Sequence, residues 1–573
     1  MGTPVCCSPP VWEVRPRDFN FEAHMARSLG IHPAVASVLR GRGIDTPEIG
    51  RAFLNPSLSN LHDPFLLPDM EAAVTRLVQA IQERETVLVH GDYDVDGVTA
   101  TALMVRFLSK LGADVQYYIP HRVVDRYGLS PDAVKQAAKL GAALVIAVDC
   151  GVTATEAIAE ATRLGLDVIV IDHHEPGETL PPACAIVDPK RHDAHYPERD
   201  LASVGLCFKT ASAVCERLGL AQEHLQRAFL DLVALGTIAD VVPLVNENRA
   251  LTSHGLKLLP QTRKVGLQAL LRMCNAERTV RSTDVAFRIA PRMNAVGRMG
   301  DATDALDLLL TDDEQEATRL ALQLEAANRE RQKEQETTYR EAIQLMDEQV
   351  DLGNDRVVVL AAPGWHVGVV GIVAAKVLER YGRPAILLAA DGDEARGSAR
   401  SIGEFDISQA LEACSDQLIR YGGHALAAGV TLLTANVAEF RIRLNGIAAQ
   451  TVSLPDLVPR ICMDAELLLD EVDAELMESL AMLEPYGQGN PSPLFLTRGA
   501  DVTDVRAVGR EEQHLKLLVS QGDRPVECIG FGMAHALQWL KRGSSVDLCH
   551  TPEINEYNGM RGIQLRLEGI RPA

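Results

Sequence analysis

Acidic and imidazole side chains recur in this sequence after apolar runs, a pattern that could bind metal ions. The tripeptide Asp172-His173-His174 follows the apolar run 168–171 and carries three potential metal ligands in succession. Several carboxylates packed together repel one another and stay protonated unless a cation neutralises them. The residues therefore predict a hydrolytic metal centre, to which further carboxylates contribute: Asp92, Asp94, Asp96, Asp149 and Asp240.

The apolar runs that precede these residues are rich in β-branched side chains, which favour strands. Runs 87–90, 144–148 and 168–171 are predicted strands, and the stretches 132–140 and 155–164 have helical periodicity. Strands that alternate with helices predict an α/β fold with a doubly wound parallel sheet. In such a sheet the carboxyl ends of the strands meet at one crevice. We therefore expect the acids and histidines to converge, although they lie far apart in the chain.

The donor set indicates which metal the centre would hold. Mixed carboxylate and imidazole ligation suits Mn²⁺ and tolerates Mg²⁺, and the absence of cysteine from the set argues against structural zinc. Two ions about 3.5–4 Å apart would activate a water and stabilise the attacking and leaving oxygens of a phosphoryl transfer. Asp92 is a further ligand or a residue behind the ligands, and His90 could be either. The ligands that would suffice for two ions are Asp94, Asp96, Asp149, His173, His174 and Asp240.

Other interpretations of these residues are weaker. The segment 92–97 resembles the start of an EF-hand calcium loop, but the twelfth position of that loop should be Glu and is Leu103 here. A single Asp at a strand end is equally well explained as a helix N-cap, and His173-His174 as hydrogen-bonded surface histidines. Four such sites in one domain favour the metal centre. A dinucleotide-binding domain is excluded because no Gly-x-Gly-x-x-Gly turn follows the first strand.

Composition limits the remaining classes of protein. The 573 residues are too many for one core, so several domains are expected. A formal net charge of −22 argues against a chain-wide electrostatic grip on nucleic acid but leaves room for a local basic groove. The eleven cysteines include no C-x-x-C pair. Neither a signal peptide nor an apolar run of about 18 residues is evident, so we expect a cytoplasmic protein without membrane association.

The chain divides into five predicted segments. Residues 1–70 form an N-terminal helical lead-in, 71–311 the catalytic α/β domain, 312–350 a connecting helix, 351–453 a smaller α/β domain, and 454–573 a β-barrel like the OB fold. The connecting helix contains no apolar residue from Asn328 to Thr338. A helix that is polar all round usually bridges two domains, so we interpret it as a rigid strut.

The order of the motifs resembles a known superfamily. DxDxDG, VDCG, DHH and ADVV are similar to the four motifs of the DHH phosphoesterases, and GGHALAAG at 422–429 is similar to the associated DHHA1 domain. Together with LEPYGQGNP at 483–491 before the barrel, residues 20–570 resemble the RecJ family of bacterial single-stranded-DNA-specific 5′→3′ exonucleases. On this resemblance, 71–311 is the DHH domain and 351–453 the DHHA1 domain.

The resemblance implies a metal-dependent exonuclease that removes 5′ mononucleotides from single-stranded DNA in recombination and in mismatch and other repair. It also implies a monomer with two Mn²⁺ or Mg²⁺ ions, and as partners a single-strand-binding protein and a repair helicase. Arg126 departs from the family, which often has Gly there, and leaves the shape of that loop open. The implied substrate-binding residues are Arg122, Ser398 and Arg400 for the 5′ phosphate, and Arg292, Asn294, Arg298, Gly423 and His424.

Several alternatives stay open at this point. Either Arg292 or Arg298 could contact the phosphate. Without the resemblance, Gly422-Gly423 is more simply a turn and His424 a core histidine, and Trp365 is either packing or part of a helix N-terminus that binds phosphate. A DHH phosphodiesterase for short oligonucleotides or cyclic dinucleotides would not need the strut and the barrel. A non-catalytic single-strand-binding scaffold would not need all the acids.

Overall fold

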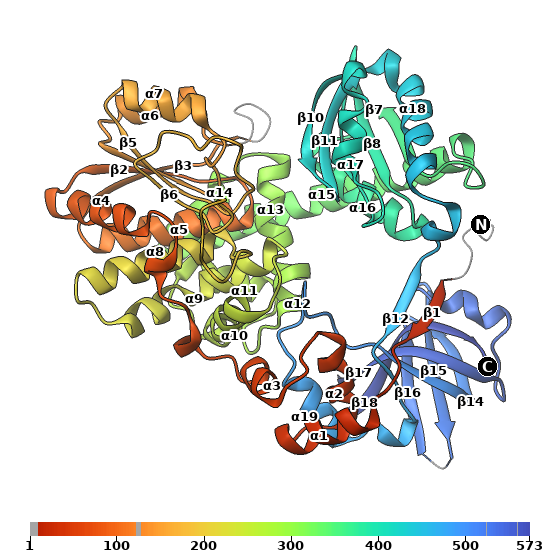
Figure 1. Cartoon of the computed structure of the whole chain (residues 1–573). Helices are drawn as coiled ribbons and strands as arrows, with labels where there is room; N and C mark the ends of the chain where they lie inside the picture. Colours follow the sequence, from red (N-terminus) through yellow and green to blue (C-terminus); the bar gives the residue numbers. More distant parts are fainter. Residues whose placement is uncertain (1–9, 122–127, 523, 558–559) are drawn as a thin grey trace. The chain divides into compact units, whose positions relative to one another are not determined.

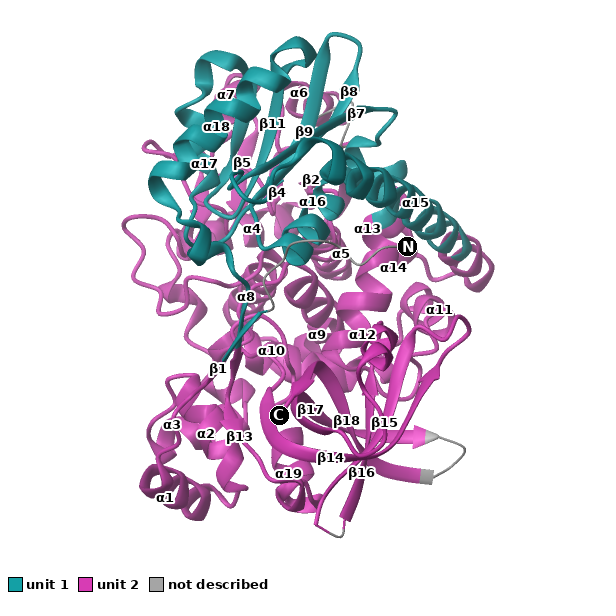
Figure 2. Ribbon diagram, turned by 90° about the vertical axis from the view of Figure 1, so that its right-hand side faces the viewer, with its two compact units in different colours: residues 1–12, 295–301, 322–461 teal, residues 13–294, 302–321, 462–573 magenta. Residues whose placement is uncertain are grey.

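The computed structural model describes residues 10–121, 128–522, 524–557 and 560–573. The chain forms two compact units (Figure 2). Unit 1 comprises residues 1–12, 295–301 and 322–461, and unit 2 comprises 13–294, 302–321 and 462–573. Among the helices of the described residues, none is long and apolar enough to span a bilayer.

A parallel sheet of five strands forms the centre of the DHH domain in unit 2 (Figure 1). The strand order is β3-β2-β4-β5-β6. The sheet contains the three predicted strands and two more, β3 and β6, that the sequence analysis did not predict. The predicted α/β fold class is confirmed. The strands span Thr86–His90 (β2), Asp114–Tyr118 (β3), Leu144–Val148 (β4), Asp167–Ile171 (β5) and Ala185–Val187 (β6).

Helices cover both faces of this sheet, as in a doubly wound fold. Helices α6 and α7 lie on one face, and α4 and α5 lie on the other (Figure 1). Helix α5 is buried along almost its whole length, because apart from Asp96, Arg106 and Lys110 its residues are apolar or small. The helices span Met70–Glu83 (α4), Val95–Lys110 (α5), Pro131–Lys139 (α6) and Thr155–Arg163 (α7).

The segment after the sheet, residues 202–310, is mostly helical. Helices α8 and α9 both pack against α5. Because α5 lies on the sheet, the end of α9 comes close to the sheet as well. A single π-helical turn, η4 (Val285–Ile289), leads into α13. The helices span Ser203–Arg217 (α8), Gln222–Ala239 (α9), Asn246–Leu258 (α10), Val265–Met273 (α11), Ser282–Asp284 (α12), Ala290–Met299 (α13) and Thr303–Leu310 (α14).

The predicted connecting helix is present as α15, which spans Glu314–Gln349. The division between the two units falls inside it, between residues 321 and 322. Its middle, 328–338, has no apolar residue, yet part of this polar stretch is buried. Asn328 and Thr338 are each only 2% exposed, because polar side chains of this length can be buried once they find hydrogen-bond partners, as Asn328 does with Arg331.

The DHHA1 domain in unit 1 is built on a second sheet of five strands in the order β10-β11-β9-β8-β7. Only the pair β7–β8 is parallel, and the others are antiparallel. Strand β10 is the edge strand and is almost wholly exposed. The elements span Val358–Pro363 (β7), Val367–Tyr381 (α16), Ala385–Asp391 (β8), Glu394–Arg400 (β9), Ile407–Glu412 (α17), Leu418–His424 (β10), Ala427–Leu433 (β11) and Val437–Thr451 (α18).

The C-terminal strands close into a barrel, which confirms the predicted OB-like domain. The order β14-β15-β16-β18-β17 is closed by pairing of β14 with β17. Short elements precede it, namely Arg460–Met463 (β12), Ala465–Glu466 (β13) and Ala474–Ala481 (α19). The barrel strands span Phe495–Val508 (β14), His514–Gln521 (β15), Arg524–Gly530 (β16), Ser545–Tyr557 (β17) and Met560–Pro572 (β18).

From residue 10 onward, the N-terminal segment consists of helices and one strand, β1 (Val11–Val14), that pairs with β12. Its helices are α1 (Phe19–Leu29), α2 (Pro33–Gly41) and α3 (Pro47–Leu54). Apolar side chains of α1 and α2, such as Met25 and Leu39, share one core with Phe495 of the barrel. The lead-in therefore packs with the far end of the chain as well as with helix α10, whose Arg249 donates to the Phe53 carbonyl oxygen.

Candidate metal centre and phosphate-binding residues

The structure brings all seven sequence-predicted metal ligands together in unit 2. They form three overlapping clusters, and within each cluster the candidate ligand atoms lie within 4.8 Å of one another. Asp149 and His173 each belong to two clusters, so they are shared between neighbouring positions. The clusters among the described residues are Asp149, His173 and His174; Asp96, His173 and Asp240; and Asp92, Asp94 and Asp149.

The parallel sheet explains why these residues meet. The loop after β2 carries Asp92 and Asp94, the end of β4 carries Asp149, and the end of β5 carries His173. Strands β2, β4 and β5 are adjacent, so their carboxyl ends lie side by side. Asp240 does not follow a strand of the sheet. It is the C-cap residue of helix α9.

Two glycines allow the close packing behind the carboxylates. A Cβ atom on Gly97, in the first turn of α5, would lie 2.7 Å from both the backbone nitrogen and the carbonyl oxygen of Asp92. A Cβ atom on Gly236 of α9 would lie 2.8 Å from a carboxylate oxygen of Asp96. The Gly of the DxDxDG motif is therefore needed because the backbone of its own loop folds back on it.

The N-terminus of helix α8 donates hydrogen bonds to two of the acids. This contact was not predicted from the sequence. The backbone N–H groups of Ser203 and Val204 donate to the Asp96 carboxylate at 2.7 and 2.9 Å. The Ser203 hydroxyl donates to Asp149 Oδ1 at 2.9 Å. Free N–H groups at a helix N-terminus favour a negative charge. The only sequence signal would have been a serine at the start of a helical stretch, which is too common to be informative.

Asp172 orients the histidines and stands outside the three ligand clusters of the described residues. Its Oδ1 accepts from the backbone N–H groups of His173 and His174 and lies 2.7 Å from His174 Nδ1. Burial is the largest influence and opposes its charge, but the hydrogen bond and charge of His174, together with the backbone N–H of Val152, outweigh burial and lower the pKa of Asp172 to about 2. Burial likewise opposes the charge of His174, but Asp172 raises its pKa to about 9. An anchored carboxylate of this kind fixes the ring of a metal-binding histidine.

The electrostatics of the cluster are those of crowded, buried acids. Burial, followed by the charge of Asp94, raises the pKa of Asp96 to about 7. Burial, followed by the charges of Asp96 and Asp94, raises the pKa of Asp240 to about 9, and burial raises that of Asp149 well above its usual value. Burial lowers the pKa of His173 to about 3. The 3.5 Å contacts from His173 Nε2 to Asp149 and Asp240 therefore join a neutral ring to the acids and are not ion pairs.

One of the clustered residues and a neighbour of another have a strained backbone. Asp149 has φ of 61°, and Val241, which follows Asp240, also has φ of 61°. This left-handed region is unfavourable for side chains other than glycine, above all for β-branched ones. Such strain persists only where the surrounding structure imposes it and is concentrated at functional sites.

The donor set fits Mn²⁺ or Mg²⁺. It combines carboxylate oxygens with imidazole nitrogens and contains no thiolate, which matches the preferences of these ions. A cation would also relieve the repulsion that raises the pKa of Asp96 and Asp240. His90 is fully buried, its Nδ1 lies 3.6 Å from Cys150 Sγ, and it is not in the clusters formed by the described residues.

We expect Mn²⁺ binding to weaken by more than about tenfold between pH 8 and pH 6, because protons compete with the ion for these carboxylates. The pKa of Asp96 is raised to about 7 and that of Asp240 to about 9, so both hold protons at pH 6. Because folding raises these pKa values, their contribution to the stability of the metal-free chain is complete below the ordinary value of 3.8 and is lost as the pH rises through 7 to 9.

Calorimetric titration of metal-free protein with MnCl₂ at pH 6 and pH 8 measures this dependence. Circular dichroism at both pH values is the control for folding. Equal affinities at the two pH values would contradict the prediction.

Two predicted phosphate ligands lie together on the DHHA1 sheet. Ser398 and Arg400 are two residues apart on β9, so their side chains lie on the same face. A Cβ atom on Gly371 of α16 would lie 3.1 Å from Ser398 Oγ and 3.2 Å from Arg400 Nη2, which places the two groups around one point. Arg400 Nη1 donates to the Ala399 carbonyl oxygen at 2.8 Å.

The GGH segment lies on the same sheet. In the register of the antiparallel strands, His424 pairs with Ala427, and Ala427 pairs with Arg400. Gly423 has φ of 148°, and a Cβ atom there would lie 2.4 Å from the Ala427 carbonyl oxygen, so glycine is required. His424 is exposed. The simpler interpretation of 422–424 as a turn with a core histidine is therefore wrong, because an edge strand leaves this side chain uncovered.

The other predicted substrate residues are placed as follows. Arg292 and Asn294 are half-buried on α13, and Arg292 Nη1 donates to the Arg288 carbonyl oxygen at 2.6 Å. Arg298, at the end of α13 in unit 1, donates from Nη1 to the Gly368 carbonyl oxygen at 3.0 Å. Arg122 lies outside the described residues.

Trp365 is a packing residue. It is only 6% exposed and belongs to the apolar core of the DHHA1 domain. Its indole Nε1 donates to Glu341 of α15 at 2.8 Å. The N-cap of α16 is the next residue, His366, whose ring accepts from the Gly368 N–H. The sequence left packing and phosphate binding equally open for Trp365, and the structure supports packing.

Fold and site together define the class of the protein. The DHH family, N-terminal domain, matches residues 86–237, the DHHA1 domain matches 354–450, and the RecJ OB domain matches 463–569. A doubly wound domain with acids and histidines at its strand ends, followed by a DHHA1 domain, is the architecture of a DHH phosphoesterase.

Sequence and structural similarity to individual proteins identifies the family within this class. The single-stranded-DNA-specific exonuclease RecJ of Bacillus subtilis is 39% identical over 561 residues, which cover 97% of this chain and 70% of the relative. RecJ of Dickeya dadantii is 37% identical, with 91% and 93% covered. The crystal structure of RecJ from Thermus thermophilus in complex with Mn²⁺ superposes with a TM-score of 0.84 at 34% identity and covers 98% of this chain and 80% of that one. This chain belongs to the RecJ family.

Proposed function

We propose that this chain hydrolyses single-stranded DNA from the 5′ end and releases mononucleotides, in DNA recombination and repair. Exonuclease action on single-stranded DNA follows from its membership of the RecJ family. The observation that carries the catalytic part is the convergence of seven acids and histidines from four segments of the chain into clusters whose ligand atoms lie within 4.8 Å. Acids at this density stay charged only when a cation neutralises them.

In this proposal the clusters hold two Mn²⁺ or Mg²⁺ ions. The RecJ of Thermus thermophilus has been crystallised in complex with each of these ions. Bound here, they would supply Lewis acidity that activates a water and neutralises charge on the phosphodiester. The chain itself does the positioning. Asp172 fixes the ring of His174, and the N-terminus of α8 fixes the carboxylate of Asp96.

The 5′ phosphate is bound, in the same proposal, by groups of the DHHA1 domain. The hydroxyl of Ser398 and the guanidinium of Arg400 meet at one point over Gly371, and an arginine fork matches the geometry of a terminal phosphate. The further residues that would contact the DNA are Arg122, Arg292, Asn294, Arg298, Gly423 and His424.

A timed digest of one oligonucleotide, labelled in parallel at its 5′ and at its 3′ end, tests the proposed function. The 5′ label should be released at once as a mononucleotide, while the 3′-labelled strand should shorten progressively. A duplex and a circular single strand are the controls, and both should resist digestion. Mononucleotides released first from the 3′ end would refute the proposed polarity.

Arg400→Ala should lower kcat/KM on a 5′-phosphorylated strand by about 10- to 100-fold, because a charge-assisted hydrogen bond to phosphate is lost. The Mn²⁺ affinity should not change. Arg396→Ala is the matched control, since Arg396 lies on the same strand but is exposed and paired with Glu394. Competition between linear and circular strands measures the effect. An unchanged preference for linear 5′-phosphorylated ends would count against the assignment.

The proposal includes a cytoplasmic monomer that works beside a single-strand-binding protein and a repair helicase. The net charge of −22 supports protein partners better than unspecific binding to nucleic acid. The two alternatives from the sequence, a phosphodiesterase of short or cyclic substrates and a non-catalytic scaffold, are less well supported. Long α15 and the barrel suit a long strand, and the acid set is complete.

A further inference from the structure

The loop that follows Asp240 at the end of α9 has a strained backbone, which other parts of the structure must stabilise. Val241 has φ of 61°, and Asn246, the first residue of α10, has φ of 44°. A β-branched residue keeps a left-handed backbone only when its surroundings impose it. The Val241 side chain is 63% exposed, so its own packing does not impose this conformation. The support must come from the rest of the loop.

That support comes from a second segment, residues 482–490, which we call the strap. The backbone N–H of Leu244 donates to the Gln488 carbonyl oxygen at 2.7 Å. Leu244 is 1% exposed. On the other side, Asn248 Nδ2 donates to the Pro243 carbonyl oxygen at 3.1 Å. The loop is therefore held between its own helix α10 and the strap.

Two glycines let the strap lie directly against the loop. A Cβ atom on Gly487 would lie 2.7 Å from Leu244 Cδ1 and 3.2 Å from its Cγ. A Cβ atom on Gly489 would lie 3.1 Å from Pro243 Cβ, and Gly489 also has φ of 71°. Any larger side chain at Gly487 must push against a buried leucine four residues after Asp240.

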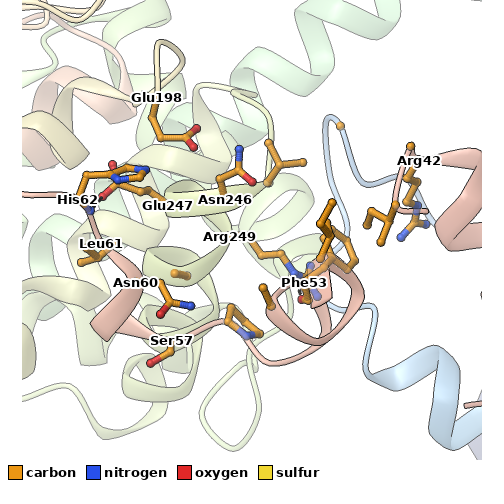
Figure 3. Close-up of a pocket in the computed structure, with 18 residues that line it drawn as sticks. Arg42, Phe53, Ser57, Asn60, Leu61, His62, Glu198, Asn246, Glu247 and Arg249 are labelled. Atoms are coloured by element: carbon orange, nitrogen blue, oxygen red, sulfur yellow. Dashed lines mark hydrogen bonds between the residues drawn. The ribbon is translucent and has the colours of Figure 1, made fainter. Parts of the chain in front are cut away.

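The strap is itself anchored by a buried arginine of α10. All five N–H donors of Arg249, which is 1% exposed, meet backbone carbonyl oxygens. Nε donates to Phe53 at 2.7 Å, and the other four donate to residues 482–485 at 2.9 to 3.4 Å. Figure 3 shows Arg249 beside Phe53 at a cavity of about 490 Å³, which Gly489 also lines. One side chain thus joins α3, α10 and the strap.

Further hydrogen bonds make the strap rigid. Asn490 is fully buried, and its Nδ2 donates to the carbonyl oxygens of Leu483 and Pro485 at 2.8 and 2.7 Å. The Ser282 hydroxyl donates to the Tyr486 carbonyl oxygen at 2.6 Å. Beyond the strap the chain enters β14 of the barrel. A rigid connection therefore runs from the barrel, through the strap, to the loop of Asp240.

We propose that the strap is a positioning element for the metal centre, so that the barrel and the Asp240 carboxylate are mechanically linked. The residues that act are Gly487, Gly489 and Arg249, none of which is itself placed near the reacting groups. The inference rests on the proposed role of Asp240 as a metal ligand. It also assigns a function to the LEPYGQGNP motif, which the exonuclease reaction does not otherwise use.

The test is Gly487→Ala in the full-length chain. Its methyl group displaces Leu244 and, through it, the loop of Asp240. We expect Mn²⁺ affinity to fall about 10- to 100-fold, the range typical for residues that orient metal ligands. The readout is a titration of metal-free protein with MnCl₂, in which electron paramagnetic resonance reports free Mn²⁺. With saturating oligonucleotide, kcat should fall while KM for the strand stays within about twofold.

The matched control is Gly562→Ala in β18, because nothing lies within 4 Å of a Cβ atom there. It should bind Mn²⁺ like the unmodified chain. Thermal melts verify that both variants fold, and Gly489→Ala, which is less crowded, provides a second measurement in the same direction. Unchanged Mn²⁺ affinity in folded Gly487→Ala, or a loss confined to KM, would overturn the proposal.

Asp240→Asn separates this proposal from the one on which it rests. If Asp240→Asn loses Mn²⁺ affinity and Gly487→Ala does not, the strap proposal fails and the ligand assignment stands. If Asp240→Asn binds Mn²⁺ with full affinity, the ligand assignment itself fails. Loss of affinity in both variants, with the Gly562→Ala control intact, supports both.

Discussion

Asp149→Ala is expected to lower the turnover of single-stranded DNA by at least about a hundredfold, because one shared ligand positions both ions. Asp149 is the carboxylate that belongs to two of the three clusters, one with both histidines and one with Asp92 and Asp94. Its hydrogen bond from Ser203 helps to hold it in place despite its strained backbone, which has φ of 61°. Single-turnover digestion of a labelled strand in Mn²⁺ measures the effect.

Binding of the strand should survive this substitution, since Asp149 is buried and repels phosphate rather than attracting it. Fluorescence anisotropy of a labelled oligonucleotide in EDTA tests this. Asp132→Ala is the matched control, because Asp132 is an exposed aspartate in the first turn of α6. Digestion by Asp149→Ala at a rate near that of the unmodified chain would show that the ligand assignment is incorrect.

Removal of divalent ions with EDTA should abolish digestion and also destabilise the folded chain. The crowded acids lose the cations that neutralise them, and a ligand that binds only the folded state stabilises it in proportion to the logarithm of its concentration. Mn²⁺ at about a hundred times its dissociation constant contributes about 2.7 kcal/mol, which raises the Tm by roughly 5–10 °C in a domain of this size. Differential scanning calorimetry with and without MnCl₂ measures this shift.

The control for metal removal is the variant without the shared ligand. In Asp149→Ala the increase in Tm on addition of MnCl₂ should be much smaller than in the unmodified chain. Activity of the unmodified chain should return when MnCl₂ is added in excess over EDTA. Full digestion in EDTA, or an equal Tm shift in both proteins, would mean that the clustered acids do not hold the ions.

The convergence of the predicted metal ligands could be predicted because local signals encode it. Strands β2, β4 and β5 are β-branched runs with an acid or histidine after each, and parallel pairing brings their ends together whatever the intervening helices contain. Strands β3 and β6 could not be predicted. Strand β3 is half exposed, and its sequence DVQYY is not an apolar run, whereas β6 is only three residues long.

The surroundings of the site could be predicted less well. Ser203 and the N-terminus of α8 reach Asp96 and Asp149 from segments 107 and 54 residues away, and no periodicity in the sequence links them. Whether His424 is a core or an exposed residue depends on its position in an edge strand, which is a property of the whole sheet. The polar run 328–338 of α15 gave no sign of which of its residues are buried, yet Asn328 is buried.

Short-range patterns of apolar and polar residues specify strands, helices and their ends, so the amino-acid sequence alone was enough to predict which acids and histidines gather, the α/β class and the order of the domains. What holds these residues in place could be seen only in the packed fold. The Arg249 guanidinium joins Phe53 and Leu483, which lie 196 and 234 residues away from it, and Gly487 meets Leu244 across a similar separation. Such contacts depend on how helices, strands and loops pack in three dimensions, and no local sequence pattern specifies that packing.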